Sequence, residues 1–153
     1  MKKRFGWMLV LLLTLTAARA HADPVVWGPQ AGISIEPTQF VFGLHAVTPL
    51  GRRVDFVPSV DFGVGKGAFT IAGNGDIHIN VAPDNSLRPY VGGGITIYNI
   101  NPNADGAGST TEVGGMLLGG IWLNRGGGTS YYLEARLGLG DVPDFKALIG
   151  LNL

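Results

Sequence analysis

The sequence predicts an all-β protein, an eight-stranded antiparallel up-and-down β-barrel, and three observations lead to this class. Glycine accounts for 25 of the 153 residues and charged residues for only 14%, unlike a helical bundle or a disordered chain. Apolar and polar residues alternate with a period of two from Val25 to Leu153, which is the pattern of half-buried strands. Eight alternating segments follow one another, and closure of an antiparallel barrel requires an even number.

Residues 1–22 are predicted to be a secretory signal peptide. Basic residues at positions 2–4 precede an apolar run over 7–18, and Ala20 and Ala22 stand at the spacing of a cleavage site. The run is shorter than a membrane helix of about 20 residues. An uncleaved anchor is the alternative. The barrel domain is therefore predicted to cover residues 23–153.

The composition excludes several classes of function. The chain contains no cysteine, so disulfides, thiolate zinc sites and cysteine nucleophiles are excluded. Removal of the predicted signal peptide leaves 7 basic residues against 11 acidic ones, and apart from the pair Arg52-Arg53 the basic residues are scattered. A nucleic-acid partner is not expected, because binding to phosphates requires clustered Lys and Arg.

The predicted strands are separated by short connections rich in Gly, Pro, Asp and Asn. They cover residues 25–36, 39–48, 52–65, 68–82, 88–100, 111–123, 130–140 and 144–153. Parallel pairing would need crossovers of a dozen or more residues, so sequence neighbours are predicted to pair antiparallel. Pro29, Pro58 and Pro89 fall within or at the start of strands, where a missing N–H predicts an edge of the ladder or a bulge.

The alternation fits two opposite barrels, and the composition of the polar face favours a membrane barrel. This face is mostly Gly, Ser, Thr and Asn, with one or two charges of mixed sign per strand. A soluble exterior normally carries a dense layer of charge, whereas small residues and paired charges suit a narrow lumen. Strands of about 9 to 11 residues also cross a bilayer. The sequence thus predicts a transmembrane barrel, and a soluble secreted barrel with an apolar lumen remains the alternative.

Charged residues on the polar face are predicted to form a network that plugs the lumen and fixes strand register. Buried charges persist in proteins when they are paired. The predicted lumen charge network consists of Arg53, Asp55, Asp61, Asp76, Arg88, Glu134 and Arg136.

Two segments resemble a known family. Arg88 to Gly94, followed by an alternating strand, and Gly140 to Lys146 look like small bacterial outer-membrane β-barrel proteins, similar to the transmembrane domain of outer-membrane protein A and to the opacity-type porins. The resemblance implies an eight-stranded barrel in a Gram-negative outer membrane and carries over no catalytic residue. The apolar dyad from Phe145 to Leu153 resembles the C-terminal signal read by the outer-membrane insertion machinery, although that signal usually ends in an aromatic residue.

The segment from Asn101 to Glu112 contains the most specific local motif. It matches the calcium-loop pattern D-x-[DN]-x-[DN]-G-x5-E at every position except the first, where Asn101 replaces Asp. Asn101, Asn103, Asp105 and Glu112 would supply the oxygen ligands. Only two of these are carboxylates and no helices are predicted beside them, so an ordinary polar loop is the alternative. No other cofactor is expected.

The predicted function is non-enzymatic: a small, monomeric outer-membrane barrel with a structural or surface-interaction role. Its expected partners are outer-membrane lipid and, during biogenesis, the insertion machinery. A soluble periplasmic or secreted barrel that binds a lipophilic ligand is the first alternative. The second is a lipid-modifying outer-membrane enzyme, which would use His45 or His78 with a serine and an acid, but no spacing in the sequence selects such a set.

Overall fold

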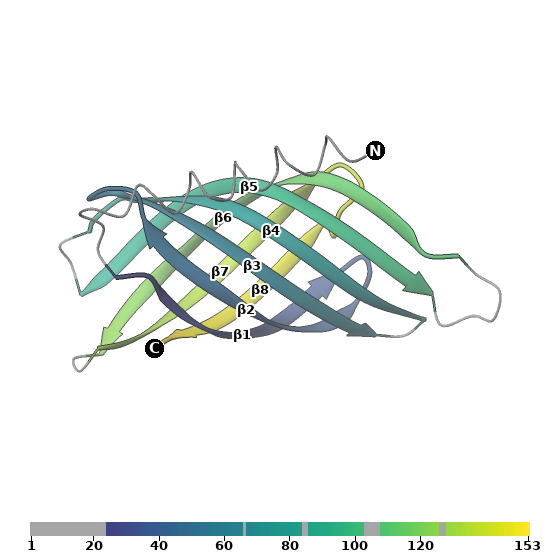
Figure 1. Cartoon of the computed structure of the whole chain (residues 1–153), viewed down its shortest axis with the longest axis horizontal. Coiled ribbons are helices and arrows are strands. Elements are labelled where there is room, and N and C mark those ends of the chain that lie inside the picture. Colours follow the sequence, from purple (N-terminus) through teal and green to yellow (C-terminus); the bar gives the residue numbers. More distant parts are fainter. Residues whose placement is uncertain (1–23, 66, 84–85, 103–107, 126–127) are drawn as a thin grey trace, which may run out of the picture.

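The computed structural model describes residues 24–65, 67–83, 86–102, 108–125 and 128–153, and these form a closed barrel of eight antiparallel strands (Figure 1). The strands are β1 (Val26–Ile35), β2 (Gln39–Pro49), β3 (Val54–Gly65), β4 (Ala68–Asn80), β5 (Leu87–Pro102), β6 (Thr110–Arg125), β7 (Thr129–Leu139) and β8 (Phe145–Asn152). The predicted fold class is confirmed. Within the described ranges, no helix is long and apolar enough to cross a membrane.

Each strand pairs with its neighbours in sequence, and β1 pairs with β8 to close the circle. This closing ladder is short: it joins Gln30–Ile35 to Phe145–Gly150, and the Leu153 amide adds one hydrogen bond to the Trp27 carbonyl at 3.0 Å. The start of β1 and the end of β8 lie at the same end of the barrel (Figure 1). We call this the terminal end, and the end that carries the β1–β2 connection the opposite end.

The structure extends β5 and β6 beyond the predicted bounds at both ends. The two strands pair continuously from Leu87↔Leu123 to Ile100↔Thr110. Beyond this ladder, Asn101 and Pro102 pair with β4, and Asn124 and Arg125 pair with β7, so pairing with the outer neighbours satisfies backbone groups at these ends. The predicted calcium motif spans their connection at the opposite end, with Asn101 on β5 and Glu112 on β6. All eight strands agree with the predicted bounds to within two residues.

The three prolines singled out in the sequence, Pro29, Pro58 and Pro89, coincide with the limits of individual ladders. The β1–β8 ladder stops at Gln30, next to Pro29, and the β4–β5 ladder stops at Tyr90, next to Pro89. The β2–β3 ladder is interrupted between His45↔Ser59 and Thr48↔Phe56, beside Pro58, and resumes in the same register. A proline has no N–H to donate, so each one ends or interrupts a ladder, as expected, and no register shift accompanies the break at Pro58.

Apolar side chains cover the outer wall, and the inside holds most of the buried polar side chains together with a smaller aromatic and aliphatic set. The β4 strand illustrates this, because Ile71, Ile77 and Ile79 are exposed while Asn74 and Asp76 are buried. Exposed residues of the same kind occur on every strand, among them Trp27, Phe40, Phe42, Leu44, Val60, Ile95, Ile97, Val113, Leu117, Leu133, Leu137 and Ile149. The faces therefore follow the transmembrane prediction, and the apolar lumen of the soluble alternative is not present in the described part of the barrel.

Candidate functional site

The centre of the lumen holds a charged cluster built around Arg136 on β7. Its Nη1 lies 2.8 Å from Asp76 Oδ2 on β4, and its Nε donates to Glu134 Oε1 at 2.5 Å. All three side chains are at most 4% exposed. Glu134 and Arg136 are two residues apart on one strand, so both point inward, and Asp76 approaches from across the lumen. One guanidinium thus bridges two carboxylates, through a hydrogen bond to Glu134 and an ion pair with Asp76.

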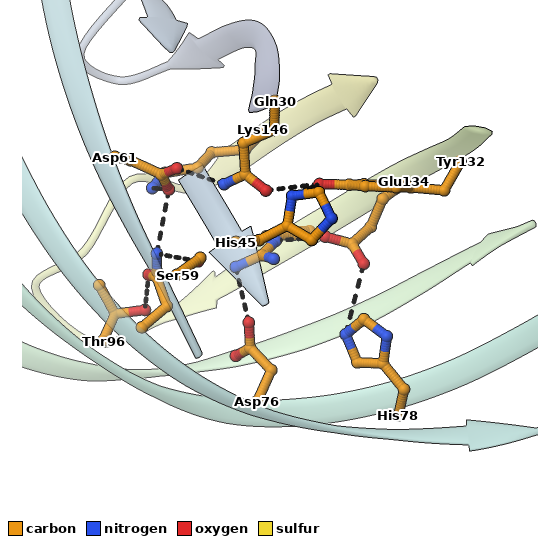
Figure 2. Close-up of polar contacts among 12 residues, drawn as sticks. Gln30, His45, Ser59, Asp61, Asp76, His78, Thr96, Tyr132, Glu134 and Lys146 are labelled. Atoms are coloured by element: carbon orange, nitrogen blue, oxygen red, sulfur yellow. Dashed lines mark hydrogen bonds and ion pairs between the residues drawn. The ribbon is translucent and has the colours of Figure 1, made fainter. Parts of the chain in front are cut away.

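A second charged pair joins β8 to β3. Lys146 Nζ lies 3.4 Å from Asp61 Oδ2, and both residues are buried. Asp61 also accepts hydrogen bonds from Gln30 Nε2 and, at 3.0 Å, from Asn74 Nδ2. Asn74 in turn accepts from the Thr96 hydroxyl at 2.8 Å and donates to Ser59 Oγ at 2.9 Å. Figure 2 shows this chain of contacts beside the Asp76 and Glu134 carboxylates.

An aromatic layer lies next to the charged cluster on the side of the terminal end. Tyr90 donates its hydroxyl to Glu134 Oε2 at 2.7 Å and stacks on His78, with ring centroids 4.5 Å apart. Trp122 packs between Tyr90 and Tyr132, at centroid distances of 5.2 and 4.8 Å. Aromatic pairs at such distances add to the apolar burial. The layer is therefore tied to the charges through a hydrogen bond and is packed as a hydrophobic core.

The two lumen histidines contact polar groups other than serine. His45 Nε2 lies 2.7 Å from Asn152 Oδ1, and His78 Nε2 lies 3.5 Å from Glu134 Oε2. The hydroxyls of Ser59 and Ser130 each accept a hydrogen bond from an asparagine amide. Among the described contacts, no Ser-His pair of the kind that activates a hydroxyl nucleophile is present.

Side chains also fill the lumen toward the opposite end. Gln39 Oε1 accepts a hydrogen bond from the Thr70 hydroxyl at 2.8 Å, and its Nε2 donates to the Ala68 carbonyl at 3.1 Å. The Lys146 ammonium lies 6.0 Å from the centre of the Tyr98 ring. A small cavity of about 10 Å³ remains between these groups and Asp61. A space of this size holds at most about one water molecule.

Two inward-facing glycines make room for the aromatic layer. A Cβ at Gly150 would overlap the Tyr132 ring, and a Cβ at Gly120 would overlap the Tyr90 hydroxyl end. Each tyrosine therefore lies over a glycine of the neighbouring strand. This packing accounts for part of the high glycine content, because bulky side chains fit a narrow barrel only where their neighbours have none.

The predicted lumen residues fall into two groups. Asp61, Asp76, Glu134 and Arg136 lie in or beside the central cluster. The remaining three, Arg53, Asp55 and Arg88, lie near the terminal end: Arg53 is exposed before β3 begins, Arg88 is half-buried, and the half-buried Asp55 accepts a hydrogen bond from Asn80 Nδ2 at 2.7 Å. The network of seven is thus divided between the lumen centre and one mouth.

Sequence reasoning did not assign Gln30, Tyr90, Tyr132 or Lys146 to the network. Lys146 and Tyr90 were recognisable as members of the polar face by alternation, which gives the face but not the partner. Gln30 and Tyr132 share a hydrogen bond between the Tyr132 hydroxyl and Gln30 Oε1. They are 102 residues apart, and the sequence contains no signal for that contact.

The predicted calcium ligands are only partly within the described residues. Asn103 and Asp105 lie outside them. Asn101 is half-buried at the end of β5, and its Nδ2 donates to Asn99 Oδ1 at 2.6 Å. Glu112 lies on β6 and is paired with Tyr98, whose side chain points inward. Within the described ranges, no three His, Asp or Glu side chains are grouped as a metal would require. Calcium binding stays a prediction.

The fold has counterparts among solved structures. No protein-family model matches the chain, and no curated protein does either. The structure of Neisserial surface protein A (NspA) superposes with a TM-score of 0.70 at 11% identity, covering 87% of this chain and 98% of that one. The N-terminal β-barrel domain of Pseudomonas aeruginosa OprF follows with a TM-score of 0.62 at 19% identity, covering 86% and 98%. Both are eight-stranded outer-membrane barrels.

This chain has the fold of the small outer-membrane β-barrels. A de novo designed transmembrane β-barrel also matches it, with a TM-score of 0.53 at 13% identity over 86% of this chain and 98% of that one. The resemblance predicted from Arg88–Gly94 and Gly140–Lys146 is therefore confirmed at the level of the fold. Fold similarity at such low identity carries no activity from these proteins to this one.

Proposed function

We propose that this protein is a non-enzymatic, monomeric outer-membrane barrel with a structural or surface-interaction role, and that its lumen is plugged. The observation that carries the proposal is the outward apolar wall, exemplified by Ile95 and Val113, each 63% exposed. In water, a continuous wall of this kind would drive association, whereas in a bilayer it is solvated by lipid. The fold shared with outer-membrane barrels supports the same location.

Export and insertion complete the proposal. Residues 1–22 direct the chain across the inner membrane and are then removed. Outer-membrane lipid surrounds the inserted wall, and the insertion machinery reads the Phe145–Leu153 segment. In support, Phe145, Ala147, Ile149 and Leu151 alternate along β8 with buried Lys146 and Leu148.

Two observations support a plugged and non-enzymatic lumen. The Arg136–Glu134–Asp76 cluster and the layer of Tyr90, Trp122 and Tyr132 occupy successive levels of a barrel whose interior is only as wide as its side chains. Both histidines are buried: His45 contacts Asn152, and His78 stacks on Tyr90. Such a barrel passes no solute, so its activity lies on its outer surfaces.

Fractionation of the expressed precursor in a Gram-negative host tests the location. We expect the mature chain in the outer-membrane fraction, as a band that migrates differently on a gel with and without boiling, because an intact barrel resists detergent. Recovery as a soluble periplasmic protein would refute the proposal.

Conductance in planar bilayers tests the plug. We expect no channel activity from the folded wild type. The triple variant Tyr90→Ala/Trp122→Ala/Tyr132→Ala removes the aromatic layer and provides the comparison. Steady conductance through the folded wild-type protein would contradict the plugged lumen while leaving the membrane location intact.

A further inference from the structure

A groove on the outer wall runs across β1 to β5 and has a volume of about 940 Å³. Its rim includes Trp27, Leu44, Phe62, Ile95 and Ile97, and its lining is almost entirely apolar. These residues belong to the outward-facing set, so the groove opens away from the lumen. It is a depression in the apolar outer wall, larger than a second one of about 570 Å³ beside Tyr131 and Leu133.

Small residues create this depression. Gly73 on β4 stands between Val60 and Ile97 in one cross-strand row, and Gly75 stands between Pro58 and Ile95 in the next row. A Cβ placed at Gly73 would meet no atom within 4 Å. Because directly opposed side chains in neighbouring strands are close together, a glycine between two large residues leaves a trough.

The groove also coincides with the break in the β2–β3 ladder. Ala46 and Pro58 line it, and both lie in the stretch where pairing between His45↔Ser59 and Thr48↔Phe56 is interrupted. The two glycines on β4, Gly73 and Gly75, and the interrupted pairing between β2 and β3 are separate properties of the sequence. They meet at the same place, near the middle of the strands.

We propose that this groove binds a single hydrocarbon chain of a membrane lipid. The inference rests on the proposed membrane location. The groove is continuous with the lipid-facing wall, so a chain enters it without leaving the bilayer. A peptide strand is a poor occupant, because its backbone would need hydrogen-bond partners and a closed barrel offers no free edge. An acyl chain needs none and gains from each methylene that it packs against the trough.

Electron paramagnetic resonance of a labelled chain tests the site. The probe is stearic acid with a nitroxide near its methyl end, titrated in increasing amounts into dimyristoylphosphatidylcholine nanodiscs that contain the full-length protein. The spectrum separates immobilised chains from mobile ones. We expect an immobilised component with the wild type that approaches one chain per barrel at saturation.

Filling the trough should remove this component. Gly73→Leu places a side chain in the open space, and we expect it to lower occupancy by at least about tenfold, since it displaces several buried methylenes of the bound chain. Gly73→Ala should have a smaller effect and serves if the leucine variant does not fold. Gly119→Leu is the matched control: it adds leucine to another outward position, on β6, where a Cβ would meet only the Tyr90 carbonyl oxygen at 3.8 Å. We expect Gly119→Leu to show the same immobilised component as the wild type.

The outcomes separate the two proposals. A heat-shifted band on a gel first establishes insertion of each variant. Inserted wild type without an immobilised component, or with one that survives Gly73→Leu, overturns the groove assignment alone. Cross-linked dimers of the wild type that are lost in Gly73→Leu, without immobilised lipid, overturn it in favour of a second copy of the chain. A wild type that does not insert overturns the proposed function and the groove assignment with it.

Discussion

Tyr131 and Tyr132 are neighbours on β7, yet they belong to two different environments. Tyr131 faces outward and is 36% exposed, whereas Tyr132 faces the lumen and is 3% exposed. At the position of Tyr131, any side chain with sufficient apolar surface would meet the requirement of the wall. The inner residue packs against Trp122 and its hydroxyl donates to Gln30. The wall is thus specified by hydrophobicity and the lumen by individual partners, although both come from the same alternating strands.

Removal of the central cation should give the largest difference between the two regions. Arg136→Leu leaves the Asp76 and Glu134 carboxylates buried without their cation, and loss of one partner of a buried ion pair costs about 3–5 kcal/mol. We expect a low refolding yield in detergent, with an unfolding midpoint in guanidinium well below that of wild type. Leu137→Ile, at the next and outward position, should be close to wild type.

A rescue variant sharpens the interpretation of that result. Asp76→Leu and Glu134→Leu combined with Arg136→Leu remove all charge from the cluster, and replacement of a whole buried ion set by apolar residues is often neutral. The triple variant should refold better than the single one. Normal refolding of Arg136→Leu alone would show that the cluster does not hold the lumen together.

A charge placed on the outer wall should lower the free energy of unfolding, and the loss should grow with the depth of the charge in the bilayer. Ile95 and Val113 are equally exposed. Ile95 lies near the middle of β5, whereas Val113 lies near the start of β6, at the opposite end of the barrel. Arginine at mid-bilayer costs about 2–4 kcal/mol and near the interface about 0–1 kcal/mol. In lipid vesicles, Ile95→Arg should therefore lower the free energy of unfolding much more than Val113→Arg. Equal effects would contradict the proposed membrane position.

Addition of a methyl group should distinguish the inner glycines from the outer ones. Gly150→Ala forces the Tyr132 ring to move, and overpacking of this kind costs about 1–3 kcal/mol. Gly73→Ala on the wall meets open space and should leave the unfolding midpoint in detergent unchanged. Equilibrium unfolding followed by tryptophan fluorescence measures both variants, and equal midpoints would argue against tight lumen packing.

The smallest expected effect comes from the hydroxyl groups of the two tyrosines. Tyr132→Phe removes the hydrogen bond to Gln30 and should cost about 1 kcal/mol in the free energy of unfolding. Tyr131→Phe changes a side chain on the wall and should cost less. If the two variants are indistinguishable, partners in the lumen contribute no more than hydrophobicity does.

The wall and the strand positions could be predicted from the sequence because period-two alternation encodes both. Each residue's face follows from its neighbours along the chain, as the β4 residues from Ile71 to Ile79 illustrate. The prolines even predicted the limits of ladders. The bounds of β5 and β6 were also predicted to within two residues, and the last residues of these strands pair with β4 and β7, respectively.

The composition of the lumen could be predicted, but its pairings could not. Alternation places Asp61 and Lys146 inside, but their contact joins β3 to β8 across the barrel. Which inward residues meet depends on strand tilt and stagger, and these are properties of the closed sheet. For the same reason, Arg53 was assigned to the lumen by alternation, although β3 begins only after it. Short-range pattern supplies the face of a residue, and only the closed barrel supplies its partner.

The short ladder between β1 and β8 has a consequence for the lifetime of the folded barrel. A ring of strands can open only where one of its joints parts, and the joint from Gln30–Ile35 to Phe145–Gly150 is much shorter than the one between β5 and β6. Strand exchange, proteolysis and mechanical extraction would all begin there. A covalent link across Ala31 and Ile149, which are paired in this joint, would secure the shortest joint of the ring. We expect it to slow spontaneous unfolding while leaving every lumen contact in place.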